Sequence, residues 1–399
     1  MSTRRLHMSK GGRYLQKKPA GGKKKKALIA VLIIVLVLVV AAAALLFFIK
    51  SKFDLINRPE PEIKNPSQEE IDSILSYVPE DSIIEGYVPT NGEQETEVTT
   101  EPTEEPTTAP TEDPGAYDPG KLGKIVNIMV VGQSWRVGED GKMSDSMILF
   151  TVNKQTKTLT LTSFLRDTYV KLANYRDSGG RPHSCGHQRL NTAYALGYSW
   201  GGAYDAMGML NQTIEENFLI DIDYNVEIDF ETFTKVIDVL GGVEIDLTAD
   251  EALYLTDNTF CEGSFTEGPN LLKGDAALSY ARIRKANPTD NDEKRSLRQK
   301  LVIEKIVGKL KSMSLTDLNN LIDTILPMIT TNMSNEDITN CIVELLPLLP
   351  KLKMASHQVP VEGVDCGQIV QIYGVNSGVL VPNLAKNQEA LKAICEDND

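Results

Sequence analysis

The sequence lacks any Cys-x-x-Cys pair, and this absence argues against a zinc ribbon or a related structural zinc site. Five cysteines are present, at Cys185, Cys261, Cys341, Cys366 and Cys395. An odd number leaves at least one thiol free. A disulfide such as Cys185–Cys261 remains open, because pairing cannot be deduced from sequence.

Acidic residues are missing from positions 1–26, a segment that holds the lysine block Lys23–Lys26 and six further basic residues. The whole chain of 399 residues nevertheless has a formal net charge of −14, so the part that follows is strongly acidic. Such an acidic portion argues against nucleic acid as a partner. For the basic segment itself, a nucleic-acid-binding arm remains the alternative to a tail that flanks a membrane.

Charged and polar side chains are absent from residues 27–49, a run long enough to cross a hydrocarbon core of about 30 Å as a helix. The run is longer than a signal-peptide core of roughly 7–15 residues, and it ends in large apolar residues before Lys50. We therefore predict an uncleaved single-pass anchor. The basic tail is expected in the cytoplasm and the C-terminal portion outside the cell membrane.

Large apolar side chains become scarce after this span, and we interpret residues 50–120 as an extracytoplasmic linker rich in Pro, Thr and Glu. The stretch 89–120 cannot bury enough apolar surface to offset its chain entropy. Proline and charge repulsion would keep such a spacer extended. Nearer the membrane, "EEIDSILSYV" could form one short amphipathic helix.

Strands and helices alternate from about residue 124 to 312, which favours an α/β domain with helices on both faces of a sheet. The predicted strands are "KIVNIMVVG", "SMILFTVN", "TLTLTSF", "YNVEIDF" and "VEIDLT". The predicted helices are 191–218 with a break at Gly201 and Gly202, "ETFTKVIDVLGG", several within 275–349, and a last one near 383–395. No repeat and no further linker is apparent, so residues 121–399 are expected to form one domain.

Arginines are concentrated in "LSYARIRKANPTDNDEKRSLRQK", where Arg282, Arg284, Arg295 and Arg298 surround Asp290 and Asp292. Guanidinium groups fit phosphate oxygens in a bidentate manner. Arg295 and Arg298 lie three residues apart on a probable helix and should share a face.

Further candidates lie at the ends of predicted strands, where side chains commonly line a ligand cleft. They are Arg136 in "GQSWR", Asp145 in "MSDSM", and the pair Arg166-Asp167 in "TSFLRDTYV". Arginines from several places together with aspartates indicate a polyphosphate site with room for a divalent metal such as Mg²⁺. Taken singly, an Arg–Asp pair is more often a surface ion pair of little energetic value.

The order of these motifs resembles the LytR–CpsA–Psr family of cell-wall polymer transferases. The resemblance rests on "NIMVVG", "SDSMILFTVN", "LTLTSFLRDTYV", "RLNTAYALG", "YNVEIDFETFTKVIDVLGGVEIDL", "LLKGDAALSYARIRK" and "RQK", and its core spans residues 124–308. It implies a three-layer α/β/α sandwich around a central mixed sheet. It also implies a phosphotransferase that moves an anionic glycopolymer, such as teichoic acid, from a polyprenyl-pyrophosphate carrier to peptidoglycan in a Gram-positive envelope.

The resemblance also implies roles for individual residues. Asp145, Arg166 and Asp292 would be catalytic, and Asp145 and Asp292 would hold Mg²⁺ or assist deprotonation. Asn191 is expected to support the site's architecture. The substrate-binding residues implied are Arg136, Arg166, Arg282, Arg284, Arg295, Arg298 and Gln299.

One position departs from the family pattern. The first strand of family members ends in Gly-x-Asp-x-Arg, whereas "GQSWR" has Gln133 after the glycine and Ser134 at the aspartate position. Loss of this carboxylate leaves three possibilities: Asp145 and water suffice, metal binding is weaker, or the protein binds the carrier without transferring polymer. The inserted loop with His183, Cys185 and His187 raises a metal site as a further alternative to a plain loop.

Competing functions follow from these observations. A regulatory protein that binds polyprenyl pyrophosphate would retain the arginines, and a pyrophosphohydrolase would use water in place of the sugar hydroxyl. A purely structural surface anchor would not require the arginines in these places. The polymer itself, whether teichoic acid, capsule or another glycan, cannot be read from the sequence.

Overall fold

The computed structural model describes residues 53, 56–78, 122–133, 144–257, 261–287 and 290–396, without the side chains of Asp145, Leu315, Thr316 and Asn319. The expected membrane span over 27–49, the basic tail, and the positions of Ser134 and Arg136 lie outside the described residues. Among the helices that are described, none combines the length and apolar character needed to cross a membrane.

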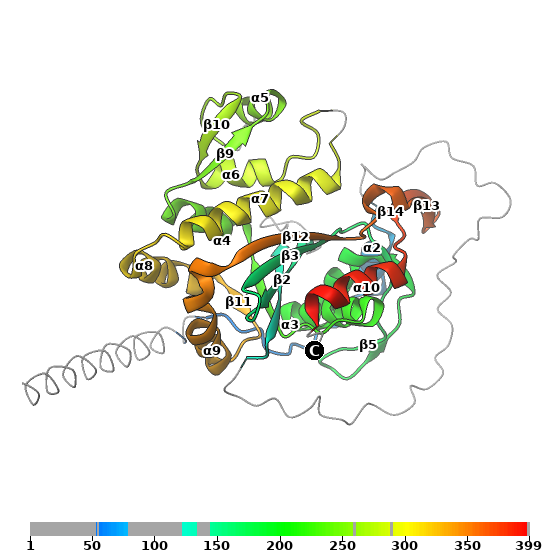
Figure 1. Cartoon of the computed structure of the whole chain (residues 1–399). Coiled ribbons are helices and arrows are strands. Elements are labelled where there is room, and N and C mark those ends of the chain that lie inside the picture. Colours follow the sequence, from blue (N-terminus) through cyan, green and yellow to red (C-terminus); the bar gives the residue numbers. More distant parts are fainter. Residues whose placement is uncertain are drawn as a thin grey trace, which may run out of the picture. The chain divides into compact units, whose positions relative to one another are not determined.

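A six-stranded mixed sheet forms the centre of the molecule (Figure 1). Its strand order is β11-β8-β1-β2-β3-β12. Antiparallel pairing joins β1 to β2, β2 to β3 and β8 to β11, whereas β1–β8 and β3–β12 are parallel. The predicted strands at the start of the domain are therefore confirmed, and the turn at 154–157 connects β2 to β3 as expected. The strands are β1 (Ile125–Gln133), β2 (Ser144–Asn153), β3 (Thr158–Phe164), β8 (Tyr224–Ile228), β11 (Thr330–Thr331) and β12 (Lys353–Val359).

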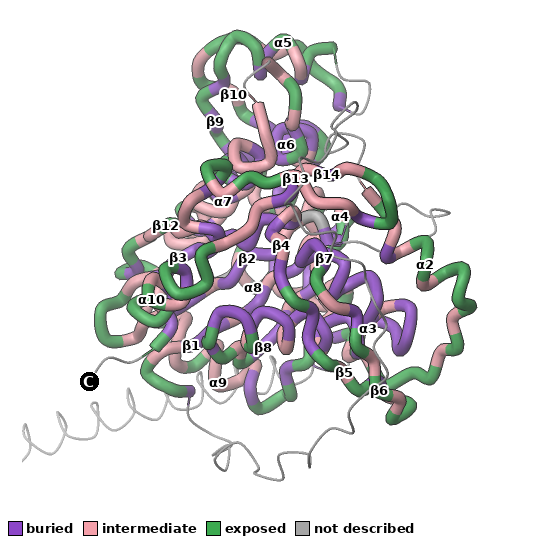
Figure 2. The backbone as a smooth tube through the Cα atoms, turned by 90° about the vertical axis from the view of Figure 1, so that its right-hand side faces the viewer, coloured by how far each residue is buried: buried purple, intermediate pink, exposed green. Residues whose placement is uncertain are grey.

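Side chains of the central strands alternate between two apolar cores, because successive residues of a strand point to opposite faces. On β2, Met147 and Leu149 join the core under α3 (Leu190–Phe218) and α10 (Leu384–Cys395). Ile148 and Val152 face the other way, onto α7 (Asp292–Leu310) and the region before β12. A smaller cluster on this second side contains Val126 of β1 and residues of α9 (Asn335–Leu345). Helices thus cover both faces of the sheet, and the buried residues in Figure 2 follow the central strands and α3.

The long helix α3 breaks where the sequence predicts it. Gly201 and Gly202 have non-helical backbone angles, and the φ of Gly202 is 69°, a value that glycine adopts at little cost. A Cβ atom at Gly201 would lie 2.0 Å from Asp205 Oδ2. The break therefore needs glycine both for its conformation and for the close approach of Asp205.

A small lobe follows β8. It contains α4 (Phe230–Val239), β9 (Val243–Leu247), α5 (Ala249–Asp257), β10 (Gly268–Leu272) and α6 (Gly274–Ala281). The predicted strand "VEIDLT" forms β9, but it pairs with β10 in a separate two-stranded sheet and does not join the central one. The lobe has its own apolar core, into which Val302 of α7 inserts. Helix α7 consequently lies between this lobe and the central sheet (Figure 1).

Residues 56–78 pack against the globular part, although the sequence analysis assigned them to the linker over 50–120. The predicted short helix is present as α2 (Gln68–Ser76), and its Leu75 is buried in the α3 core. Asn57 bridges to Thr330 on the edge strand β11. Apolar side chains at helical spacing explain this difference, since they have a core to join.

The C-terminal part contains strands that sequence periodicity did not reveal. Besides β12, a hairpin of β13 (Gly367–Ile372) and β14 (Val375–Leu380) precedes α10. Four short strands lie between β3 and α3: β4 (Tyr169–Lys171), β5 (Tyr175–Arg176), β6 (Pro182–His183) and β7 (His187–Arg189). The remaining elements are α8 (Leu315–Ile325) and 3₁₀ turns at Leu326–Met328, Leu346–Lys351 and Gly363–Cys366.

Candidate functional site

Arg166 and Asp167 lie directly after β3, where the chain leaves the central sheet. The side chain of Arg166 is only 4% exposed. Its Nε lies 3.4 Å from Asp167 Oδ2 and 3.5 Å from Asp292 Oδ1. The end of β3 and the start of α7 therefore meet at a buried guanidinium group.

The start of α7 supplies the next two members of this cluster. Asn291 caps the helix by accepting a hydrogen bond from the Lys294 backbone N–H at 2.9 Å, which fixes the first turn. Within that turn, Asp292 Oδ1 lies 2.7 Å from Nη2 of Arg295, three residues on and on the same face. The structure thus brings Arg166, Asp292 and Arg295 together, as the sequence analysis predicts for a phosphate site.

Arg189 completes the cluster, and sequence reasoning missed it. Its Nε lies 3.0 Å from Asp167 Oδ1, and its side chain is 2% exposed. Twenty-two positions separate Arg189 from Asp167, and only the pairing of β4 with β7 brings the two together. The next residue but one, Asn191, donates its backbone N–H to the Arg166 carbonyl at 3.4 Å, in keeping with the architectural role expected for this segment.

The resulting cluster, called here the arginine ladder, alternates in charge. Its members are Arg189, Asp167, Arg166, Asp292 and Arg295. Three guanidinium groups face two carboxylates, so these five side chains carry one more positive than negative charge. Guanidinium groups bind phosphate oxygens with good geometry. A cluster of three of them is therefore suited to holding an anion such as a phosphate group.

Arg298 does not join the ladder, although it lies only one turn from Arg295. Its Nε lies 2.7 Å from Glu251 Oε1 in α5, and its Nη2 lies 3.1 Å from Asp290 Oδ1. Its Nη1 donates to the Ile283 carbonyl. Burial raises the pKa of Asp290, but hydrogen bonds led by that from Arg298 outweigh it and lower this pKa below its usual value. Arg298 therefore joins the small lobe to α7 and the preceding loop, because acidic groups reach its guanidinium from both sides.

Gln299 and Arg282 have contacts of a different kind. Gln299 accepts a hydrogen bond from Ser146 Oγ at 3.0 Å, which places it beside β2 one residue after Asp145. Arg282, exposed at the C-terminal end of α6, lies over the Phe230 ring with its Cζ 4.5 Å from the ring centroid. Such stacking orients a guanidinium group without neutralising its charge. Arg284 is half-buried two residues further on.

Of the two carboxylates predicted to hold Mg²⁺, the side chain of Asp145 lies outside the described residues. Asp292 Oδ1 lies 3.5 Å from Arg166 Nε and 2.7 Å from Arg295 Nη2, so this oxygen faces guanidinium groups. No group of three or more metal-ligating side chains occurs among the described residues.

At the carboxyl end of β1, Gln133 donates to Tyr194 OH at 2.7 Å. Burial, and next the charge of Glu227, raise the pKa of this Tyr194 hydroxyl.

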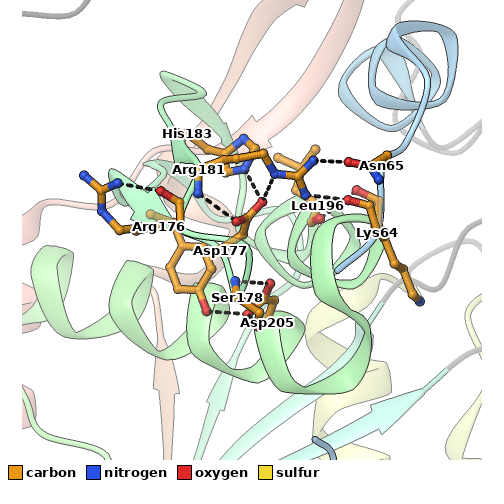
Figure 3. A network of polar contacts seen from close by, with 12 residues as sticks. Lys64, Asn65, Arg176, Asp177, Ser178, Arg181, His183, Leu196 and Asp205 are labelled. Atoms are coloured by element: carbon orange, nitrogen blue, oxygen red, sulfur yellow. Dashed lines mark hydrogen bonds and ion pairs between the residues drawn. The ribbon is translucent and has the colours of Figure 1, made fainter. Parts of the chain in front are cut away.

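The inserted loop with His183, Cys185 and His187 forms a polar network rather than a metal cluster among the described residues (Figure 3). His183 Nε2 lies 2.9 Å from Asp177 Oδ2, and its ring stacks on Trp200 with 3.7 Å between centroids. His187 lies on β7 beside Tyr169. All five cysteines are free thiols, so the possible Cys185–Cys261 disulfide is not present.

The same network ties the segment before α2 to α3. Arg181 donates through Nε to Asp177 Oδ2 at 2.7 Å, through Nη1 to Asn65 Oδ1 at 2.8 Å, and through Nη2 to the Lys64 carbonyl. Asp205, across the break in α3, accepts from Ser178 and Tyr175. Figure 3 shows Arg181 between Asp177 and the 64–65 segment. Through Arg181, these contacts join segments of the chain that lie more than a hundred positions apart in the sequence.

Comparison with known proteins identifies the family. The profile of the LytR_cpsA_psr family matches residues 87–392 of the chain. The chain belongs to this family. The family resemblance drawn from the motifs is thus confirmed.

Three curated relatives support the assignment. The chain is 28% identical over 253 residues to TagT of Bacillus subtilis (strain 168), named a polyisoprenyl-teichoic acid–peptidoglycan teichoic acid transferase. It is 30% identical over 212 residues to a TagU transferase of the same description from Bacillus licheniformis, and 30% identical over 274 residues to Biofilm regulatory protein A of Streptococcus mutans. The matches cover 62%, 53% and 67% of this chain. They span 70% of TagT but only 61% and 63% of the other two relatives.

Solved structures show the same fold. The structure titled "TagT bound to LIIa-WTA" matches with a TM-score of 0.52 and 27% identity, over 70% of this chain and 93% of that one. The protein gbs0355 from Streptococcus agalactiae matches with a TM-score of 0.54 at 23% identity, over 68% and 88% of the two chains. The mixed α/β fold with a central mixed sheet is therefore that of the family.

Proposed function

We propose that this protein transfers an anionic cell-wall glycopolymer from a polyprenyl-pyrophosphate carrier to peptidoglycan. The observation that carries the proposal is the arginine ladder, in which three buried guanidinium groups gather where β3 and β7 end and α7 begins. Its family relatives TagT and TagU are named as teichoic acid transferases. TagT has a solved structure bound to LIIa-WTA, which supports a ligand of the same class here.

The proposed reaction is an in-line displacement at phosphorus. A hydroxyl oxygen of peptidoglycan forms a bond to the phosphorus that bears the glycan, and the bond from this phosphorus to the polyprenyl phosphate oxygen breaks. The hydroxyl proton passes to solvent or to the departing phosphate. Catalysis of phosphoryl transfer rests mainly on positioning and charge stabilisation, so no covalent enzyme intermediate is required.

Each group of arginines has its own part in this proposal. Arg166 and Arg295 would face the pyrophosphate, where preorganised cations offset the charge that develops on the leaving group. Arg282, held by stacking on Phe230, and Arg284 would contact outer phosphate oxygens. Arg298 would act indirectly, because its contacts with Glu251 and Asp290 hold α7 in place.

The proposal includes a magnesium ion bound beside the pyrophosphate. Its protein ligand would be Asp145, with pyrophosphate oxygens completing the coordination, since Asp292 is engaged by guanidinium groups. When bound, the ion would neutralise charge on the pyrophosphate. We expect the Ser134→Asp variant, which restores the family carboxylate, to bind geranylgeranyl pyrophosphate with a stronger dependence on magnesium than wild type.

The proposal includes attachment to the cell membrane. Residues 27–49 would anchor the chain with the basic tail in the cytoplasm, and the carrier's lipid would then be reached from the outer leaflet of a Gram-positive membrane. The partners are the polyprenyl-pyrophosphate-linked glycopolymer, peptidoglycan and membrane lipid.

Product analysis with the full-length chain in detergent tests the function. The substrate is a polyprenyl-pyrophosphate-linked teichoic acid precursor, supplied with peptidoglycan as acceptor. A covalent polymer–peptidoglycan conjugate is expected. Release of free phosphorylated polymer would identify a pyrophosphohydrolase instead, and neither product would indicate a binding protein.

A second candidate is a regulatory protein that binds the carrier without transferring polymer. Two observations favour it: the serine at position 134, and the name of one relative, Biofilm regulatory protein A. In that case wild type would bind geranylgeranyl pyrophosphate regardless of magnesium, and no conjugate would form.

A further inference from the structure

Arg189 lies at the opposite end of the arginine ladder from Arg295 and connects three segments of the chain. It ends β7 and directly precedes α3, and its partner across the β4–β7 pair is Tyr169. Its Nη2 donates to Ser377 Oγ and, at 3.3 Å, to the Gly378 carbonyl, both on β14. Its guanidinium is therefore fixed between Asp167 and the C-terminal hairpin.

The backbone reinforces this junction. The Leu380 N–H donates to the Asp167 carbonyl at 2.9 Å, and the Leu190 N–H donates to the Thr168 carbonyl at 2.8 Å. Ser377, which accepts from Arg189, has no exposed surface. The position of Arg189 relative to Asp167 is therefore determined by two strand connections rather than by a flexible side chain alone.

Asp167 lies between two cations and must divide its charge between them. Its Oδ1 lies 3.0 Å from Arg189 Nε, whereas its Oδ2 lies 3.4 Å from Arg166 Nε. The shorter contact is the one to Arg189. A carboxylate that is compensated on one side attracts a cation on its other side less strongly, especially where water is scarce.

We infer that Arg189 is a positioning residue that holds Asp167 and thereby limits the pull of this carboxylate on Arg166, which the proposed function places at the pyrophosphate. This inference rests on the proposed function, and it assigns Arg189 no contact with substrate. Without Arg189, Asp167 would draw Arg166 toward itself and compete with the phosphate oxygens. The C-terminal hairpin, through Ser377 and Gly378, becomes part of the support of the site.

A charge-rescue experiment separates this role from a purely structural one. The probe is geranylgeranyl pyrophosphate, and equilibrium binding is measured with the full-length chain in detergent. We expect Arg189→Met to weaken binding by about 10- to 100-fold, by analogy with the loss seen when a residue that orients a metal ligand is removed. The double variant Arg189→Met/Asp167→Asn should recover most of that loss, since the competing carboxylate is gone. A loss caused by misfolding would not be recovered by removing Asp167.

The control is Arg181→Met, the same change in the network of Figure 3, which should bind the probe as wild type does. Two results overturn the inference: a folded Arg189→Met variant with unchanged affinity, or a double variant as weak as the single one. Should Arg189→Met fail to fold, the single variant Asp167→Asn tests the inference instead. The inference requires this variant to bind the probe more tightly than wild type, and weaker binding would contradict it. Failure of wild type to bind the probe would remove the proposed function and this inference together.

Discussion

Two Arg-Asp dipeptides occur ten residues apart, and their side chains serve different purposes. In the first, Arg166 is buried and Asp167 is partly buried, and both belong to the arginine ladder. In the second, Arg176 is exposed and donates to the Gly180 carbonyl, while Asp177 accepts from Arg181 and His183. Identical dipeptides thus contribute to a cluster of three guanidinium groups in one place and, in the other, to a network whose carboxylates accept hydrogen bonds from nearby donors. The partners contributed by distant elements decide the role, and the dipeptide does not.

The largest expected effect contrasts the arginines of the two dipeptides. Arg166→Gln should abolish polymer transfer, a drop of about 1,000-fold or more, because a cation that stabilises phosphoryl transfer is lost. Arg176→Gln removes an exposed arginine and should leave transfer unchanged. Conjugate formation by the two variants is measured side by side. Equal activity in both would remove Arg166 from the site and erase the functional difference between the dipeptides.

The next effect concerns Arg298. Its position in the sequence predicts a place in the ladder, but its carboxylate partners are satisfied within the fold, as in the network of Figure 3. Arg298→Met leaves Glu251 and Asp290 without their shared guanidinium, so we expect the free energy of unfolding to fall by about 3 kcal/mol. Urea denaturation measures this loss. Lys294→Met provides the control, since Lys294 lies 3.6 Å from the same Asp290 with a more exposed side chain and should contribute little. A stable Arg298→Met protein that has lost only probe binding would return Arg298 to the substrate-binding group.

A third effect depends on pH and belongs to the second dipeptide. Burial raises the pKa of Asp177, but hydrogen bonds from His183 and Arg181 outweigh it and hold this pKa below its usual value. The carboxylate therefore stabilises the fold above the ordinary aspartate pKa of about 4, and this contribution is lost as the pH falls through the lower folded value. Asp177→Asn should lower the free energy of unfolding by about 1–3 kcal/mol at neutral pH and by less under acid conditions.

Urea titrations of wild type and Asp177→Asn at neutral and acid pH check this prediction, with transfer activity expected to be unchanged at neutral pH. A stability difference that stays constant across pH would show that the ionised form of Asp177 is not what matters.

Much of the fold was predictable because its strongest elements have clear local patterns. The apolar runs of β1, β2 and β3 and the glycine break in α3 are written in short stretches of sequence, and the structure confirms them. The edge strand β12 and the hairpin β13–β14 were missed, since mixed side chains give them no regular alternation. Likewise, nothing local indicated that β9 would leave the central sheet to pair with β10.

The site was predictable in its residue types but not in its membership. Arg166, Asp292 and Arg295 lie close together as expected. Arg298 instead forms an ion pair with Glu251, a residue of α5 that no sequence motif connected with it. Arg189 escaped notice because its relation to Asp167 exists only after β4 and β7 pair. Charge compensation is a property of three-dimensional neighbours, so sequence spacing alone cannot assign it.

The smallest effect compares two cation–π contacts, Arg282 on Phe230 near the candidate site and Lys64 on Tyr198 near the network of Figure 3. We expect only the first to affect binding of the probe. Phe230→Leu removes the ring beneath Arg282 and should weaken binding of geranylgeranyl pyrophosphate by about two- to fivefold, as expected for a cation–π contact of about 0.5–1 kcal/mol. Tyr198→Leu removes the ring beneath Lys64, 4.2 Å from its Nζ, and should leave probe binding unchanged. Titrations of the two variants under identical conditions decide the point. Equal affinities would mean that Arg282 is oriented by other contacts, and that stacking contributes to neither region's function.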